Sequence, residues 1–224
     1  MHSFHNFVTV MGSDYFQPVV VLCEALLRTK PDPLELNAMT SPRERGYAAS
    51  ICLLAVVCFE SFMRRVRYLK KNNLSQRQRN EKSMLGLFRK LFPDHRLTCM
   101  LTEVYVLRDA IAHGHLWEVS YDLDDNWDQH VKQAIRDSID DNKKFDAAVD
   151  LSTRQTRKLG LNVLPSRVNR TDVAKVLDII FEALRFLQKE VDEDWQTDKR
   201  TVGFRGQRME LIKCVDTIKT DCFA

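Results

Sequence analysis

The 224-residue sequence has few of the residues that interrupt regular structure, with seven glycines and six prolines. This scarcity argues against a long disordered or low-complexity segment. The first ten residues have neither the basic flank nor the continuous apolar core of a signal peptide. The most apolar stretch, residues 48–59, is shorter than the roughly 20 residues that a helix needs to cross a bilayer. We therefore expect a soluble protein that does not enter a membrane.

Common nucleotide- and metal-binding signatures are also missing. The sequence has no P-loop, no G-x-G-x-x-G and no C-x-x-C among its six cysteines. A chain of this length needs no disulfides to fold, so we expect free, structural thiols and a reducing compartment, the cytoplasm. No cofactor is predicted.

The net charge of +3 hides an uneven distribution. Residues 64–96 contain eleven Lys or Arg and two acids, a local charge of +9. Residues 118–150 contain ten acids and four bases, a local charge of −6. Basic residues return between 154 and 170 with no acid among them. Such runs are either solvated helix faces or a basic surface for a polyanion.

Hydrophobic periodicity predicts a mainly α-helical protein. Ser41-Pro42-Arg43-Glu44 offers a serine N-cap, a proline at the first helical position and a glutamate for a capping box. The helix that it opens runs to about Lys71, and its first half is apolar on all sides, which places it at the centre of a bundle. Glu60 interrupts this run, as an edge residue or a paired structural carboxylate.

Apolar spacing and capping residues predict four further helices. They are a helix over residues 14–28 capped by Ser13, a basic helix from the capping box Ser75-x-x-Gln78 to about residue 91, a helix over residues 95–114 capped by Asp94, and a final amphipathic helix capped by Asn169 or Thr171.

Two segments depart from this helical pattern. Residues 119–168 suggest a small mixed α/β insert, with a strand at 119–123, a short helix at 127–138 and a pair of strands within 147–164. Residues 196–224 are expected to form a polar C-terminal tail with a helix over 207–217. The helical domain then spans residues 1–195, with its core in residues 40–118 and 169–195.

The segment Arg108-Asp109-Ala110-Ile111-Ala112-His113 places three reactive side chains near a helix end. Asp109 and His113 are four residues apart and share one helix face, where the carboxylate can orient the imidazole and favour its charged form. A base, an orienting carboxylate and the fixed cation of Arg108 suit proton transfer at a phosphodiester. The alternative is an ordinary helix-end cluster in which the helix dipole stabilises the histidine.

The same segment ends in a His113-x-His115 pair. Residues two apart on a helix point away from each other, and no third ligand lies nearby in the sequence, so no metal site is predicted.

These residues resemble the R-x4-6-H motif of HEPN domains, including the polar residue directly after the arginine. The order of elements is similar too. A long apolar helix containing Phe59-Glu60-Ser61-Phe62 precedes the motif helix, and an amphipathic helix follows it. The resemblance covers about residues 40–195, although the insert at 119–168 has no counterpart in the family.

The resemblance implies a HEPN-like helical bundle that dimerises through its motif helices and forms one composite, metal-independent ribonuclease site. His113 would act on the ribose 2′-hydroxyl or the leaving oxygen, Arg108 would stabilise charge on the phosphate, and Asp109 would orient its neighbours. Many such proteins are toxins or phage-defence effectors. Some are controlled by an antitoxin that adenylylates a tyrosine two positions past the histidine, and here that position is His115, which departs from this mode of control.

The expected RNA-binding residues are Lys70, Lys71, Arg77 and Arg79 in the basic segment, with His115 beside the motif. The expected partners are RNA, a second copy of the chain, and an antitoxin or another defence-system protein. The rival function is a catalytically silent HEPN-like module that binds RNA or a partner protein. The intact Arg-Asp-His set favours the enzyme.

Overall fold

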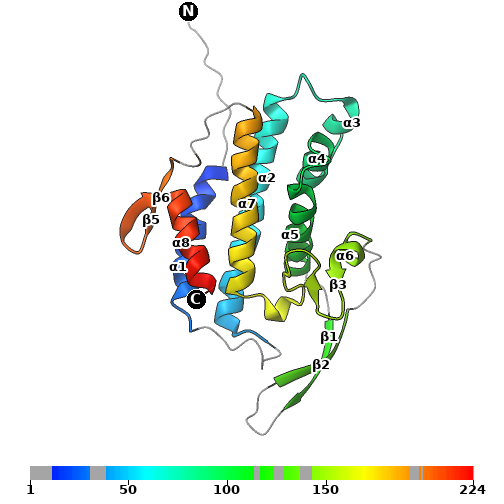
Figure 1. The fold of residues 1–224 in the computed structure, drawn as a ribbon, viewed down its shortest axis with the longest axis vertical. Coiled ribbons are helices and arrows are strands. Elements are labelled where there is room, and N and C mark those ends of the chain that lie inside the picture. The colour runs from blue at the N-terminus through cyan, green and yellow to red at the C-terminus, as the bar shows by residue number, and fades with distance from the viewer. Residues whose placement is uncertain are drawn as a thin grey trace, which may run out of the picture.

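The computed structural model describes residues 12–30, 39–113, 117–123, 129–136, 143–191, 197 and 199–223. Within these residues the protein is mainly α-helical, as the periodicity predicts. Its long helices lie side by side as a bundle, with short two-stranded sheets around it (Figure 1).

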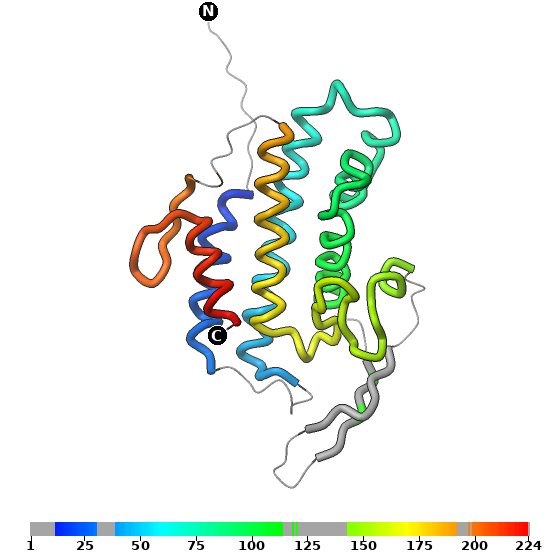
Figure 2. The backbone as a smooth tube through the Cα atoms, viewed as in Figure 1, coloured from blue at the N-terminus to red at the C-terminus, as the bar shows by residue number. Residues whose placement is uncertain are grey.

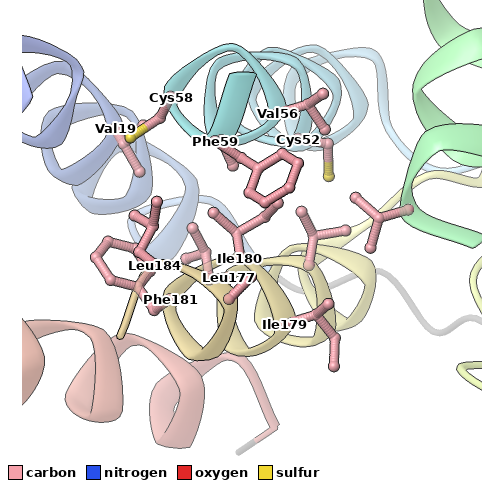
Figure 3. Close-up of a cluster of buried hydrophobic side chains, with 14 of the residues drawn as sticks. Val19, Cys52, Val56, Cys58, Phe59, Leu177, Ile179, Ile180, Phe181 and Leu184 are labelled. Carbon is pink, nitrogen blue, oxygen red and sulfur yellow. The ribbon is translucent and has the colours of Figure 1, made fainter. Parts of the chain in front are cut away.

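The central element is α2 (Pro42–Leu69), which packs against α1 (Phe16–Leu27), α5 (Leu97–Ala112) and α7 (Arg170–Val191). Its serine cap and first-turn proline are confirmed, because the Ser41 hydroxyl accepts the backbone N–H of Glu44 at 3.3 Å and Pro42 is the first helical residue. The Glu44 carboxylate, which was expected to close a capping box, instead accepts bonds from Arg170. Phe59 points from α2 toward the apolar side chains of α7 and is fully buried (Figure 3). One side of the apolar half of α2 therefore lies at the centre of the core, while Val57 on the other side is 40% exposed.

By length and composition, α2 could also cross a bilayer. It has 28 residues, and its most apolar 18-residue window has a mean hydropathy of 1.8. The expectation drawn from residues 48–59 alone understated this, because the apolar pattern continues to Val66. Half of that window is buried inside the bundle, and the packing of α2 against three helices accounts for its composition, which is compatible with a soluble protein.

A buried ion pair joins α2 to α7 near their N-termini. The Glu44 carboxylate accepts bonds from Arg170, at 3.0 Å from Nε and 3.2 Å from Nη2. Arg170 Nη2 also donates to the carbonyl and hydroxyl oxygens of Thr29, at 3.1 and 3.0 Å. Three segments distant in sequence are thus tied at one point.

Several helix boundaries differ from the predictions. Ser13 does not cap α1, since a 3₁₀ turn (Gly12–Tyr15) precedes that helix. At α5, the N–H of Leu97 donates to Nδ1 of His95 rather than to Asp94, and the helix starts two residues later than expected. Asn169 is the cap of α7, because its side-chain oxygen accepts the N–H of Thr171 at 2.8 Å.

The basic helix predicted from Ser75 to residue 91 is wrong in one respect, because it consists of two helices. The Ser75 capping box is present, but α3 (Gln76–Arg79) ends after one turn. A second cap at Ser83, whose hydroxyl accepts the N–H of Gly86 at 3.3 Å, starts α4 (Met84–Leu91). Two competing N-caps so close together explain the break.

The insert contains both strands and a helix, as expected. The strand predicted at 119–123 is β1 (Trp117–Leu123), but the helix predicted at 127–138 is wrong, because the described part of this range forms β2 (Gln129–Arg136). Antiparallel pairing with β1 satisfies the backbone of β2, so pairing across the hairpin overrides the helical pattern.

The second half of the insert lies beside α5. It comprises α6 (Lys143–Ala148), β3 (Val149–Asp150), β4 (Gln155–Thr156) and a 3₁₀ turn (Pro165–Arg167). The strand pair expected within 147–164 is confirmed in this short form. After α6 the chain folds back along α5 before it enters α7 (Figure 2).

The segment expected to be a polar tail is folded into the bundle. Its hairpin, β5 (Thr201–Phe204) and β6 (Gln207–Glu210), turns at Arg205 and Gly206, both with positive φ, as a two-residue hairpin loop requires. The helix predicted over 207–217 instead begins after this hairpin, as α8 (Leu211–Phe223). Its apolar residues join the core against α7 and α1, namely Leu211, Cys214, Val215, Ile218 and Cys222.

All six cysteines are free thiols, and five are buried. Burial raises the pKa of Cys214 to about 12 and that of Cys222 to about 11, so these thiols stay protonated at neutral pH. They behave as small apolar core residues, in agreement with the structural role expected from the sequence.

Candidate functional site

The predicted motif occupies the last turns of α5. Arg108 and Asp109 are partly buried on this helix, while His113 is exposed at its C-terminal cap, where its N–H donates to the carbonyl oxygen of Asp109 at 3.0 Å. His115 lies outside the described residues. The structure therefore places Arg108, Asp109 and His113 within one and a half turns of a single helix end.

Arg108 is oriented by two carboxylates and an aromatic ring. Its Nη1 lies 3.0 Å from Oδ1 of Asp109, and its Nη2 lies 3.4 Å from Oε1 of Glu60 on α2. The guanidinium carbon lies 5.0 Å from the ring centre of Tyr105, one turn earlier on α5. With 28% of its side chain exposed, Arg108 is held in place without being enclosed.

Tyr105 links the two sides of this cluster. Its hydroxyl donates to Oε1 of Glu60 at 3.0 Å. Burial first, and the charge of Glu60 second, raise the pKa of Tyr105 far above its usual range, so the hydroxyl stays protonated and remains a donor. Tyr105 thereby fixes the oxygen of Glu60 that faces Arg108.

The Asp109 carboxylate does not contact His113 among the described residues, contrary to the orienting role expected from their spacing. Its Oδ1 pairs with Arg108 and its Oδ2 with Nζ of Lys144 on α6. Two cations compete successfully for this carboxylate because each offers a charge-assisted bond, whereas the imidazole lies at the exposed helix end. Arg108, Lys144, Glu60 and Asp109 form a network with no net charge.

Three residues of this network were not singled out as site residues from the sequence. Glu60 was interpreted as an edge residue or a paired structural carboxylate, and the pairing is confirmed, with Arg108 as the partner. Tyr105 lies three residues before Arg108, so helical spacing alone places the two side chains on one face. Lys144 carries no local signal, because only the folding of the insert onto α5 brings it to Asp109.

The cations predicted to bind RNA lie elsewhere. Nζ of Lys70 is 5.9 Å from the ring centre of Phe92, and Nζ of Lys71 is 4.5 Å from that of Tyr68. Arg79 donates from Nε to the carbonyl oxygen of Leu74 at 2.9 Å, and Arg77 is exposed. These residues lie around the end of α2 and α3, whereas α6 lies toward the other end of the bundle (Figure 1). The structure does not bring them to the motif.

The described residues contain no group of three or more His, Cys, Asp or Glu placed to hold a metal ion. At the motif the structure places a partly exposed guanidinium, an exposed imidazole and two carboxylates. Comparisons with protein-family models, with curated proteins and with solved structures found no match.

Proposed function

We propose that this protein is a metal-independent endoribonuclease whose site is built on the C-terminal end of α5. The observation that supports it best is the arrangement of Arg108. Glu60, Asp109 and Tyr105 orient this side chain while 28% of it stays exposed, and it lies within one and a half turns of the exposed His113. A fixed cation beside an accessible imidazole suits attack of a ribose 2′-hydroxyl on its own phosphodiester.

In this proposal His113 removes the proton of the 2′-hydroxyl. The oxygen then attacks the adjacent phosphorus, the bond to the 5′-oxygen of the next nucleotide breaks, and that oxygen takes a proton from the protonated His113 of a second copy of the chain. The products are a 2′,3′-cyclic phosphate and a 5′-hydroxyl. Arg108 stabilises the negative charge that grows on the phosphate oxygens. Asp109 and Glu60 hold Arg108 in position, which is a narrower role for Asp109 than the orientation of His113.

A second copy of the chain would complete the site. One helix end supplies only one imidazole, while the leaving oxygen needs a proton donor of its own. The face of α2 that carries Glu60 also carries Val57, which is 40% exposed, one turn away. A two-fold pairing over this face would cover Val57 and bring two motif ends together. A cytoplasmic toxin or defence effector, held by an antitoxin or another partner protein, is the physiological setting that we propose.

One observation favours the rival function, a silent RNA- or protein-binding module. The network around Arg108 has no net charge, and Asp109 faces Lys144 instead of His113. A module of that kind needs no free base, so it would tolerate loss of His113.

The deciding experiment is cleavage of labelled single-stranded RNA in the presence of EDTA. We expect cleavage to continue, products to end in 2′,3′-cyclic phosphate, and His113→Ala and Arg108→Ala to lower the rate by about 10² to 10⁴. Arg185→Ala, which removes an exposed arginine from α7, is the matched control and should cleave normally. Toxicity on expression should be relieved by His113→Ala. Cleavage that stops on chelation, acts on DNA, or survives His113→Ala contradicts the proposal.

Specific activity tests the two-fold site separately. It should fall on dilution once the protein is below the dimer dissociation constant. A monomer, identified by light scattering under assay conditions, that cleaves RNA at the full rate per chain would rule out the composite site.

A further inference from the structure

The second half of the insert is firmly docked on the outer side of α5. Glu103 on α5 is 3% exposed, and its carboxylate accepts the backbone N–H groups of Lys158, at 2.9 and 3.1 Å to its two oxygens, and of Leu159 at 2.7 Å. A buried carboxylate with three such bonds is a strong anchor, because its desolvation is offset by charge-assisted bonds.

An apolar cluster separate from the main core supports the same contact. It joins Val106 of α5 to residues of α6, β3 and the chain that follows, namely Phe145, Ala148, Val149 and Val163. Phe145 is 1% exposed and directly follows Lys144, so its burial fixes the backbone that carries Lys144. The insert is thus a rigid part of the surface beside the motif.

This docking sets three cations along α5. Lys158 is exposed and its Nζ lies 3.2 Å from Sγ of Cys99, near the start of the helix. Arg157 is exposed beside it, and Lys144 reaches Asp109 near the end of the helix. From Cys99 to Asp109 the helix rises about 15 Å. We name the surface formed by Lys144, Arg157 and Lys158 the insert seam.

Three cations of segment 64–96 are engaged within the bundle, whereas Arg157 and Lys158 of the seam are both exposed. In that segment Arg67 donates to the carbonyl oxygen of Glu81, Lys90 pairs with the Glu81 carboxylate, and Arg89 donates to Thr102. These bonds hold α3 and α4 against α2 and α5.

At the seam, within the described residues, neither Arg157 nor Lys158 forms an ion pair with a carboxylate. Of the two acids of the docked segment, Asp146 is exposed, and Asp150 accepts bonds from the N–H and hydroxyl of Ser152 at 2.9 and 2.6 Å while the charge of Arg157 acts on it from farther away. Positive charge on the insert therefore remains available to a ligand.

We infer that the insert seam is the surface on which single-stranded RNA lies, with its phosphates on Lys158, Arg157 and Lys144, leading to the motif end of α5. The inference rests on the proposed function for the choice of RNA. Lys144 contacts Asp109, so the seam is continuous with the candidate site, which the cations around α3 are not. A single strand is the form whose 2′-hydroxyl and phosphate can be turned toward side chains.

The test measures binding, not cleavage. A fluorescent single-stranded oligonucleotide with 2′-O-methyl riboses cannot undergo the proposed attack, and its affinity is followed by anisotropy over a range of salt concentrations. The seam variant carries Lys144→Gln, Arg157→Gln and Lys158→Gln. The control, with the same loss of charge, carries Arg185→Gln, Lys189→Gln and Arg208→Gln, all exposed on α7 or β6. A third variant replaces Lys70, Lys71, Arg77 and Arg79 by Gln.

We expect the seam variant alone to bind weakly, with the slope of log affinity against log salt smaller by about 2, since each contact to a single-stranded phosphate contributes about 0.7. Equal losses in the seam and control variants, a loss confined to the third variant, or no binding by the unaltered protein would overturn the inference. If the triple variant does not fold, Arg157→Gln and Lys158→Gln singly should each lower the slope by about 0.7. If the protein binds RNA through the seam but never cleaves it, the proposed nuclease function is wrong and the inferred RNA-binding surface is supported.

Discussion

Arg170 and Arg108 are both held by carboxylates, but Arg170 is enclosed by the bundle and Arg108 lies at its edge. The side chains of Arg170 and Glu44 are 11% and 3% exposed, and Arg170 also donates to Thr29. Those of Arg108 and Glu60 are both 28% exposed, and a ring covers one face of the guanidinium. The hydrogen-bond donors of Arg170 are used to join α2, α7 and Thr29, just after α1. The guanidinium of Arg108, in contrast, stays partly exposed to solvent. The degree to which the guanidinium is buried and hydrogen-bonded thus distinguishes a structural arginine from a candidate site arginine in this protein.

The strongest test of this contrast is Arg170→Ala. It leaves the Glu44 carboxylate buried without its partner, so the free energy of unfolding should fall by about 3 to 5 kcal/mol, measured by urea denaturation. Arg185→Ala on the exposed face of the same helix should change it by less than about 0.5 kcal/mol. Equal stability of the two variants would show that the enclosed pair is not structural.

Asp172, at the start of α7, is another fully buried carboxylate. It accepts bonds from the backbone N–H groups of Asn162 and Asn169, at 2.9 and 3.1 Å, but burial dominates and raises its pKa to about 6. The folded state therefore holds this proton more tightly than the unfolded chain, whose Asp has a pKa of about 3.9. Its contribution to stability is full below pH 4 and is lost as the pH rises to 6.

On this basis the free energy of unfolding should decrease from pH 4 to pH 6 by on the order of 3 kcal/mol on account of Asp172. The measurement is urea denaturation across this range for the protein and for Asp172→Asn, which cannot titrate. The difference between the two curves isolates this group from other carboxylates. Parallel curves would mean that the pKa of Asp172 is the same in the folded and unfolded states.

Glu103 is as buried as Glu44, but its hydrogen-bond partners belong to the insert. Its substitution should therefore affect the docking of the insert more than the stability of the bundle. Glu103→Gln removes the charge from three backbone bonds and should weaken the docking of the insert by about 2 kcal/mol. Hydrogen exchange at the amides of Lys158 and Leu159 should then accelerate by about 30-fold, while amides in the middle of α2 and α7 stay protected. Glu190→Gln, at an exposed position of α7, is the control. If hydrogen exchange accelerated equally throughout the bundle, Glu103 would stabilise the whole bundle and not only the docking of the insert.

The smallest effect on stability is expected for Arg108→Gln. Its ion pairs are partly exposed, so the free energy of unfolding should fall by less than about 1 kcal/mol. The same change should lower RNA cleavage by about 10² to 10³. A large loss of stability without a specific loss of activity would assign Arg108 to the same class as Arg170.

The sequence predicted the helices whose signals are local. The cap at Ser41, the capping box at Ser75 and the cap at Asn169 depend on residues within one turn, and all three are present. Two local predictions, the caps at Ser13 and Asp94, were wrong. The larger errors depended on tertiary pairing. Residues 129–136 have no local feature that reveals β1 as their partner, and the apolar positions of α8 are spaced among so many polar residues that their burial was not evident.

The candidate site shows the same division. The sequence predicted that Arg108, Asp109 and His113 lie near the end of one helix, and the structure places them there. Their partners were not predicted, because Glu60 comes from a helix 48 residues earlier and Lys144 from an insert 35 residues later. The pairing of Asp109 with Lys144 instead of His113 depends on how the insert docks, which helical spacing cannot reveal.

The position of α8 has a consequence for how this protein is made. Leu211, Cys214, Val215 and Ile218 fill the core between α1 and α7, so the first and last described helices complete the same packing layer. During synthesis α1 emerges early, and the surface around Cys23, which lies near Cys214 and Cys222 in the folded protein, is not covered until α8 has been made. Such long-range closure slows folding, since the entropy of a loop of almost the whole chain is lost before these contacts form.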